Sequence, residues 1–212
     1  MKNKFNIVSA VCFLIIPLAL AQETPKTMMA VTVKRVEPAE SASFLSQPKK
    51  FWRAGTKYAR IEEAPDAVNR VHGLVIVNEP DAWMINLFDK SGRHMVDPGP
   101  TFNARLPIFD AISGASAGVT ALEFGRELEF FAKDNAKRSG IESIRGKPTD
   151  RYELTVDTSK LILWISTESK KPLRISLIHG DHTQTFEYVS YQDNLEFDPS
   201  LFWPPTGIAV VE

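Results

Sequence analysis

A run of small residues with a serine at its centre is the feature of this chain that most suggests covalent catalysis. Residues 114–118 read Gly-Ala-Ser-Ala-Gly, which matches the Gly-x-Ser-x-Gly turn that presents the nucleophile of many serine hydrolases. Ser116 would need partners such as Asp157 and His179, and the turn would have to join a buried strand to a helix in a parallel sheet. The strand–helix alternation of that fold is missing from the sequence. A small-residue loop before a helix is the favoured interpretation, and the hydrolase stays an alternative.

Two histidines at a predicted hairpin tip are the nearest approach to a metal site. His179 and His182 flank a Gly180-Asp181 turn, and the carboxylate of Asp181 lies between them. Two histidines without further ligands at fixed spacing do not specify a metal site. Paired acids such as Glu62 and Glu63 likewise lack the spacing of an acid/base pair. We therefore predict no catalytic residues, no metal and no cofactor, and a protein that is not an enzyme.

The aromatic residues suggest a binding function instead. The chain has 13 phenylalanines, 4 tryptophans and 4 tyrosines, which is many for one small core. A strongly curved sheet with few covering helices leaves an apolar groove, and such a groove is a default ligand site. The aromatic residues that we expect to contact a ligand there are Tyr58, Trp83, Phe124, Phe131 and Trp164.

Alternating and β-rich segments predict two meanders of antiparallel strands. In one hairpin, folding about Gly180-Asp181 sets Arg174 opposite Glu187 on one face and Ile175 opposite Phe186 on the other, as a half-buried sheet requires. The run Leu-Ile-Leu-Trp-Ile at residues 161–165 is apolar on both faces and predicts a central strand. The predicted strands cover residues 28–36, 51–53, 57–61, 72–78, 82–88, 94–96, 140–144, 151–156, 161–166, 173–179, 182–191 and 208–211.

One helix is predicted between the two meanders, over residues 120–137. Thr120 and Glu123 fit a capping box, and Gly140 follows as a stop. Its apolar stripe at helical spacing consists of Ala121, Phe124, Leu128, Phe131 and Ala132. The predicted fold is thus mostly β with some α: one large curved antiparallel sheet, an open half-barrel, covered by one main helix.

The first residues predict export. A basic start, an apolar stretch and the small residues at 19–21 are typical of a secretory signal peptide cleaved after Ala21. Residues 22–27 would form a flexible lead-in and residues 28–212 a single β domain. Cys12 lies inside the signal, so the mature chain would have no disulfide. The apolar run of the signal is too short for a membrane span, and we expect no transmembrane segment in the mature chain. The 25 basic and 26 acidic residues are scattered, which argues against a nucleic-acid partner.

Three stretches carry a resemblance to a known family. Residues 57–62 read Lys-Tyr-Ala-Arg-Ile-Glu, and residues 74–87 form a hairpin in which Trp83 follows the turn. Closing strands and a proline-rich end occupy residues 163–165, 171–174 and 202–207. Together with the export signal, these stretches resemble the LolA-like superfamily of periplasmic lipoprotein carriers and their relatives. The resemblance implies that Arg60 and Trp83 occupy the positions of the cavity arginine and aromatic residue that help to hold or release acyl chains.

The residues and the resemblance together predict a periplasmic, non-enzymatic carrier or binder of an apolar ligand. The ligand would be a lipid or an acyl chain of a lipidated protein, and outer-membrane lipoprotein sorting is one such role. An envelope protein-interaction or stress-sensing module is a second possibility, with Phe130 and the aromatic-proline run at residues 202–205 as its docking surface. The third is the hydrolase that uses Ser116.

Overall fold

The structure, a computed structural model, describes residues 24–38, 47–97, 99, 107–109 and 115–211. The predicted signal peptide, residues 1–21, lies outside the described residues, as do residues 110–114 before Ser116. The first described strand, β1, begins at Thr27.

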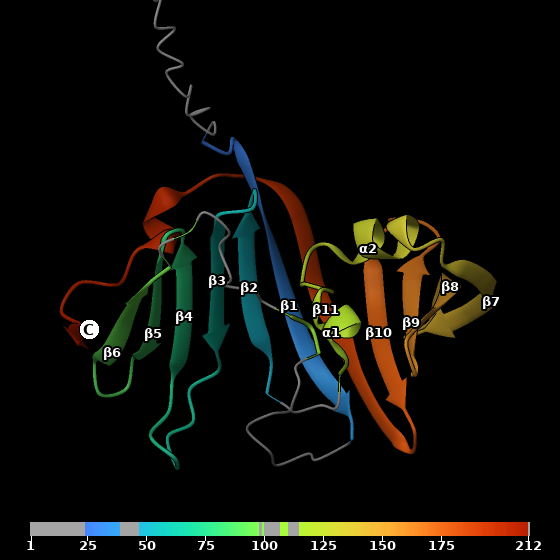
Figure 1. Cartoon of the computed structure of the whole chain (residues 1–212), viewed down its shortest axis with the longest axis horizontal. Coiled ribbons are helices and arrows are strands. Elements are labelled where there is room, and N and C mark those ends of the chain that lie inside the picture. Colours follow the sequence, from blue (N-terminus) through green and yellow to red (C-terminus); the bar gives the residue numbers. More distant parts are fainter. Residues whose placement is uncertain (1–23, 39–46, 98, 100–106, 110–114, 212) are drawn as a thin grey trace, which may run out of the picture.

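Twelve strands form one sheet within the described part of the chain (Figure 1). In chain order they are β1 (Thr27–Glu37), β2 (Lys49–Ala54), β3 (Tyr58–Glu63), β4 (Gly73–Asn78), β5 (Asp81–Asn86), β6 (Ser91–Val96), β7 (Lys137–Ile144), β8 (Lys147–Val156), β9 (Ser159–Ser166), β10 (Pro172–His179), β11 (His182–Glu196) and β12 (Ala209–Val211). Their order in space is β12-β6-β5-β4-β3-β2-β1-β11-β10-β9-β8-β7. All neighbours pair antiparallel except β12, which runs parallel to β6. The predicted curved antiparallel sheet is therefore confirmed.

The long strand β1 joins the two meanders. It pairs with β2 on one side and with β11 on the other, from Thr27 opposite Glu196 to Glu37 opposite Thr185. Three register shifts interrupt its ladder with β11, and such irregularities bend and twist a strand. The sheet can therefore curve at its middle, where the first meander, β1–β6, meets the second, β7–β11.

The hairpin of β10 and β11 has the predicted register. Arg174 lies opposite Glu187, and Ile175 lies opposite Phe186. The guanidinium of Arg174 donates to the carboxylate of Glu187, including a bond of 3.1 Å from Nε. The prediction for β9 is also confirmed, because residues 161–164 are buried on both faces of the sheet.

The single predicted helix over residues 120–137 is wrong. The structure has two short helices, α1 (Ala117–Thr120) and α2 (Glu127–Lys133), and β7 already begins at Lys137. Gly125 adopts φ +85° between them, a conformation outside the helical region that suits glycine. Glu123 does not cap a helix but pairs with Arg53 of β2. Contacts with the sheet thus override the local helix propensity.

Each face of the sheet has its own apolar core. We call the face on which α1 and α2 pack the helix face. In Figure 1, α1 lies near β11 and α2 near the upper ends of β9 and β10, and neither covers β3–β6. The core of the helix face includes Val33, Phe109, Leu163, Ile175 and Phe131. The opposite, tail face of the first meander packs under the C-terminal segment, residues 197–208, which contains η3 (Pro199–Phe202). Its core includes Ala54, Leu74, Ile76, Trp83, Ile85 and Phe202.

The core of the helix face predicts a large cost for truncation at its centre. Leu163 is fully buried on β9, so Leu163→Ala should lower the free energy of unfolding by about 2–5 kcal/mol, the usual range for such cavities. Val189 on β11 is exposed, and Val189→Ala should change it by less than about 0.5 kcal/mol. Urea unfolding of both variants measures this, and equal costs would contradict the assigned core.

Candidate ligand-binding groove

A groove of about 1680 Å³ runs along the helix face. Its floor is formed by apolar side chains from adjacent strands, among them Phe51 of β2, Ile61 of β3 and Met84 of β5. Ile108 and Phe124 line it from the covering side. The cavity exceeds the usual size of sites for small drug-like ligands, so it suits a long or branched apolar ligand.

Polar and charged side chains gather at one end of the groove, which we call the mouth. This end lies where β1 and β3 finish and where β2 and β4 begin, because neighbouring strands run antiparallel. Lys49 and Glu63 form an ion pair there, and Thr185 donates a hydrogen bond of 2.8 Å to Glu37. The polar and charged residues at this end are Arg35, Glu37, Lys49, Glu63, His179, Asp181, His182 and Gln184. An apolar floor with a polar mouth matches a ligand that has an apolar chain and a polar end.

The segment that covers part of the groove, residues 122–127, is attached to β2. The guanidinium of Arg53 forms an ion pair with Glu123, and its Nε donates to the carbonyl oxygen of Phe124 at 3.0 Å. The rings of Phe51 and Phe124 stack with their centroids 3.9 Å apart. Both side chains of the ion pair are nearly buried, where removing one partner costs more than at the surface. The position of Phe124 in the groove wall therefore depends on β2.

A second attachment joins the covering segment to β11. The carboxyl of Glu127 is fully buried; its Oε1 accepts a hydrogen bond of 2.6 Å from the Tyr188 hydroxyl and one of 2.9 Å from the Gly125 amide. Its Oε2 has no hydrogen-bond partner among the described residues. Burial raises the pKa of Glu127 above its usual value, although these hydrogen bonds oppose the shift. Burial and the neighbouring Glu127 raise the pKa of Tyr188 well above its ordinary value, so the tyrosine stays a donor.

The structure divides the six predicted ligand-binding residues between the two faces. Phe124 lines the groove, and Phe131 is buried in the core of the helix face. Trp164 borders the groove, but its indole lies on the other side of β9. Tyr58, Arg60 and Trp83 lie on the tail face, which packs under the C-terminal segment. Their part in ligand binding stays a prediction, but they are not among the residues that line this groove.

The three tail-face residues contact the C-terminal segment. The Tyr58 ring lies 5.4 Å from that of Phe202, and Arg60 donates to the carbonyl oxygen of Leu201 at 3.0 Å. Trp83 is 6% exposed, stacks on His94 with centroids 5.1 Å apart and approaches Trp203. Trp203 itself is 53% exposed. These contacts favour a structural role for Trp83 in fastening the C-terminal segment.

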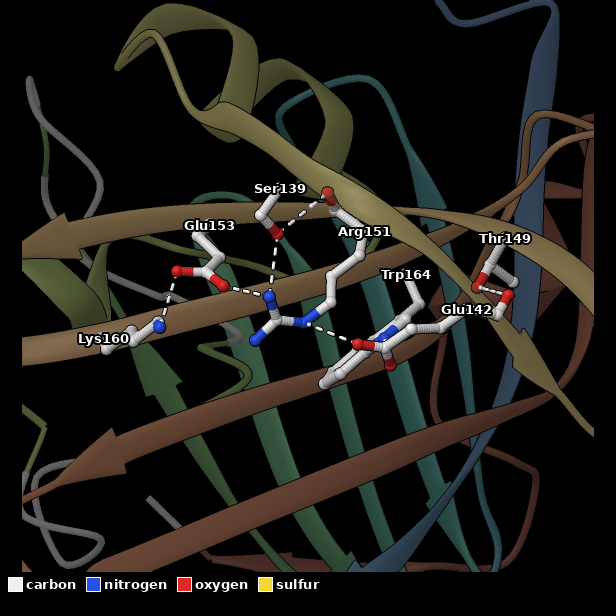
Figure 2. Close-up of polar contacts among 7 residues, drawn as sticks. All are labelled: Ser139, Glu142, Thr149, Arg151, Glu153, Lys160 and Trp164. Atoms are coloured by element: carbon white, nitrogen blue, oxygen red, sulfur yellow. Dashed lines mark hydrogen bonds and ion pairs between the residues drawn. The ribbon is translucent and has the colours of Figure 1, made fainter.

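Trp164 belongs to a polar network on the side of β9 opposite the helix-face core. Its indole lies between the guanidinium groups of Arg151 and Arg174, whose carbons are 5.8 and 5.7 Å from the ring centroid. The indole Nε1 donates to Glu142 at 2.7 Å (Figure 2). Arg151 also pairs with Glu142 and Glu153 (Figure 2). The network fixes β7 and β8 against β9 and holds the Trp164 indole rigidly on the side of β9 away from the helix-face core.

Sequence reasoning missed part of the groove. Val75, Met84 and Phe186 line it. Their alternation along the predicted strands indicates that they share a face of the sheet with other apolar residues. It does not indicate which face of the sheet stays open. The contact between Arg53 and Glu123 joins residues 70 positions apart, and no local sequence pattern predicts it.

The candidate catalytic and metal-binding residues do not assemble into a site. Ser116 is the N-cap of α1, and its Oγ has no hydrogen-bond partner within the described ranges. The strands around it are antiparallel, not the parallel sheet that a nucleophile elbow requires. His179 accepts or donates a hydrogen bond of 3.0 Å with Ser159. No cluster of three or more metal-ligating side chains occurs among the residues that the structure describes.

The docking surface predicted for a protein-interaction module, Phe130 with residues 202–205, is only partly accessible. Phe202 is buried in the core of the tail face, and Phe130 packs against the core of the helix face. Trp203 is the exposed large apolar residue of the C-terminal segment. Within the described residues, no helix has the length and apolar character needed to cross a membrane.

Comparisons with known proteins give similarity of fold. No family model and no curated protein matches the sequence. An uncharacterized conserved protein from Thermus thermophilus superposes with a TM-score of 0.52 at 9% identity, over 88% of this chain and 90% of that chain. MucB, in a Pseudomonas aeruginosa complex of MucA and MucB, gives a TM-score of 0.47 at 11% identity, over 88% of this chain and 59% of the matched chain.

One further similar structure is described as a LolA superfamily protein. A LolA superfamily protein from Nitrosomonas europaea gives a TM-score of 0.37 at 12% identity, over 85% of this chain and 90% of that chain. At such identities the likeness concerns the fold alone.

The buried carboxyl of Glu127 predicts a specific pH dependence of stability. Because its folded-state pKa is raised, the native state holds a proton that the unfolded state releases, so this contribution is complete below the unfolded pKa and is lost as pH rises through the folded pKa. Glu127→Gln removes the titration while retaining an oxygen acceptor for Tyr188. Its stability relative to the wild type should therefore rise between pH 4 and pH 8, as measured by urea unfolding. A relative stability that falls over this range would contradict the prediction.

The environment of Trp83 predicts a structural rather than a binding defect. Trp83→Ala should lower the free energy of unfolding by about 3–5 kcal/mol, as truncation of a buried large aromatic does. The indole of Trp203, which contacts that of Trp83, is half-exposed. Trp203→Ala should therefore lower the free energy of unfolding by clearly less than Trp83→Ala does. Thermal melts and titration with a fluorescent fatty acid test both variants. A stable Trp83→Ala protein that has lost binding would instead place Trp83 in the ligand site.

Proposed function

We propose that this protein is a periplasmic, non-enzymatic binder or carrier of an apolar ligand, held in the groove of the helix face. The ligand class is a lipid, or the acyl chains of a lipidated protein. The observation that carries the proposal is the groove itself, with an apolar floor and a polar mouth. Export rests on the signal peptide that the sequence predicts at residues 1–21.

The energetics of such a site favour acyl chains. Each methylene that leaves water contributes about 0.8 kcal/mol, and the floor offers a continuous apolar surface for many of them. Met84 is 55% exposed in the floor, and its flexible thioether can adapt to ligands of different shape. The mouth then leaves the polar end of the ligand close to water and to hydrogen-bonding side chains.

The proposal also fits the lack of an assembled catalytic centre around the candidate residues that the structure describes. Ser116 is the N-cap of α1, and His179 is hydrogen-bonded to Ser159. The groove offers shape and apolar area for a ligand. A carrier needs only differential affinity for its ligand, which burial supplies. Lipoprotein sorting is one role within this class, suggested by the sequence resemblance.

A charge in the floor should abolish binding without unfolding the protein. Met84→Glu places a carboxylate where an acyl chain would lie, and burial of that charge by the ligand is unfavourable. We expect the affinity for a fluorescent fatty acid to fall by about tenfold or more, while the exposed position keeps stability within about 0.5 kcal/mol.

The matched control is Val189→Glu, on an exposed position of β11 that is not among the groove residues. It should bind the fatty acid like the wild type. Equal affinities of the wild type and Met84→Glu, or a wild type that binds no fatty acid, would contradict the proposal.

A further inference from the structure

The two outer edges of the sheet are built differently. One edge is β7, which carries the charged residues Lys137, Arg138 and Glu142. Its pairing with β8 is interrupted by a register shift between Arg138 and Gly140. Charged side chains and bulges are common means by which proteins stop an exposed strand from pairing with another chain. The β7 edge is therefore guarded against such pairing.

The other edge is β12, and it lacks these guards. β12 lies beside the C mark in Figure 1 and pairs in parallel with residues 91–93 of β6, and no described strand pairs with its outer side. Residues 207–211 read Gly-Ile-Ala-Val-Val, without a charge or a proline, and Glu212 follows them. All three residues of β12 are exposed. This strand therefore presents an uncharged edge on which another strand can pair.

The backbone of β12 determines how a second strand would pair with it. The Ala209 N–H donates to the carbonyl oxygen of Lys90 at 2.8 Å, so Ala209 directs its backbone groups inward, toward β6. Successive residues of a strand direct these groups to opposite sides, so Val210 directs its N–H and C=O outward. Two residues that lie opposite each other in an antiparallel ladder can exchange both of these bonds. Val210 can therefore pair with Val210 of a second copy, about a twofold axis between them.

Exposed apolar side chains gather near this edge. Met84 of β5 is 55% exposed, Met95 of β6 is 39% exposed and Val211 of β12 is 66% exposed. Arg93 lies opposite both Met84 and Val211, and Met95 follows it by two residues, so these side chains share the helix face. Val210, 40% exposed, lies on the tail face. Contiguous exposed apolar surface of this kind marks an interaction site.

We propose that β12 is a dimerisation edge, on which a second copy of this chain adds its own β12 in antiparallel register about Val210. The occupant is a second copy because the edge is complementary to itself, as a twofold interface requires. Val210 would lie opposite its own copy and Val211 opposite Ala209 of the second copy, so every side-chain pair of the two strands is apolar. These strands offer no charge that would select a charged peptide instead.

The charge and the size of this contact predict a weak dimer. The charged residue of β6 beside β12 is Arg93, and two β12 strands would separate it from its copy by about 14 Å, at ~4.8 Å per strand. That distance exceeds the Debye length of about 10 Å at 0.1 M salt, so repulsion is small. Three residues per strand bury less than the about 1,200 Å² of stable interfaces. We therefore expect a dimer that is populated at about 100 µM and above.

Dimerisation would place both grooves on the same side of a joined sheet. The twofold axis between antiparallel neighbours is normal to the sheet, so the two helix faces point in the same direction. Met84, Met95 and Val211 of both copies would then form one apolar strip that runs from one groove floor to the other. The pairing itself uses backbone groups and β12 side chains, so it does not depend on a bound ligand.

Sedimentation equilibrium of the full-length protein between about 10 µM and about 1 mM tests the proposal. The wild type should shift from monomer to dimer as its concentration rises. Val210→Lys would set two ammonium groups opposite each other, so dimerisation should weaken by about tenfold or more. Ile141→Lys is the matched control, because Ile141 is 64% exposed on the other edge strand, β7. This control should dimerise like the wild type, and thermal melts should show all three proteins folded.

Disulfide cross-linking tests the register of the two strands. Cys12→Ser removes the natural cysteine of the chain, and Val210→Cys in this background should form a linked dimer on mild oxidation, because paired residues lie about 5.5 Å apart at Cα. Val211→Cys should cross-link clearly more slowly, since its two copies would be separated by about 8 Å. Val211 is the more exposed of the two residues, so accessibility alone predicts the opposite order.

Three results would overturn the proposal. One is a wild type that stays monomeric up to about 1 mM, which would leave this edge to an extended segment of a different protein. The others are equal dimerisation of the wild type and Val210→Lys, and faster cross-linking at position 211 than at position 210. Fatty-acid titration at low micromolar protein, where the monomer predominates, tests the groove separately, and Val210→Lys should bind the fatty acid like the wild type.

Discussion

The attachment of residues 122–127 to the sheet is the contact on which the binding groove depends. Arg53 and Glu123 form a nearly buried ion pair, and the stacked rings of Phe51 and Phe124 lie beside it. Tyr188 holds the other end of the segment through the buried carboxyl of Glu127. A sheet with one bare apolar face would expose that face to water. The attached segment covers part of it and leaves the remainder as a lined cavity.

The aromatic residues of the chain serve two faces of the same sheet. On the tail face, Trp83 and its neighbours pack under the C-terminal segment and close that side. On the helix face, Phe51, Phe124 and Phe186 combine core packing with the walls of the groove. Closing one face while leaving part of the other open leaves an accessible apolar surface in the groove. The polar mouth lies at one end of the groove, so the two ends of the site differ in polarity.

Much of the fold could be predicted from the sequence, because strand alternation and turn chemistry are local. The β10–β11 register followed from opposite charges at Arg174 and Glu187 around a Gly-Asp turn. The helix was predicted too long, since the apolar stripe around Phe124 also fits a segment that lies flat on the sheet, and the pairing of Glu123 with Arg53 is a long-range contact. The aromatic residues predicted a groove but could not be assigned to a face, because period-two patterns do not say which side stays open.

Native mass spectrometry of the protein isolated from its own cell envelope is the most direct test of the central claim, that the helix face holds an apolar ligand. The groove predicts a population heavier than the polypeptide by the mass of a lipid or acylated molecule, which organic extraction removes and which Met84→Glu protein lacks. A wild-type protein that is free of ligand and gains none when incubated with a mixture of envelope lipids would contradict the account.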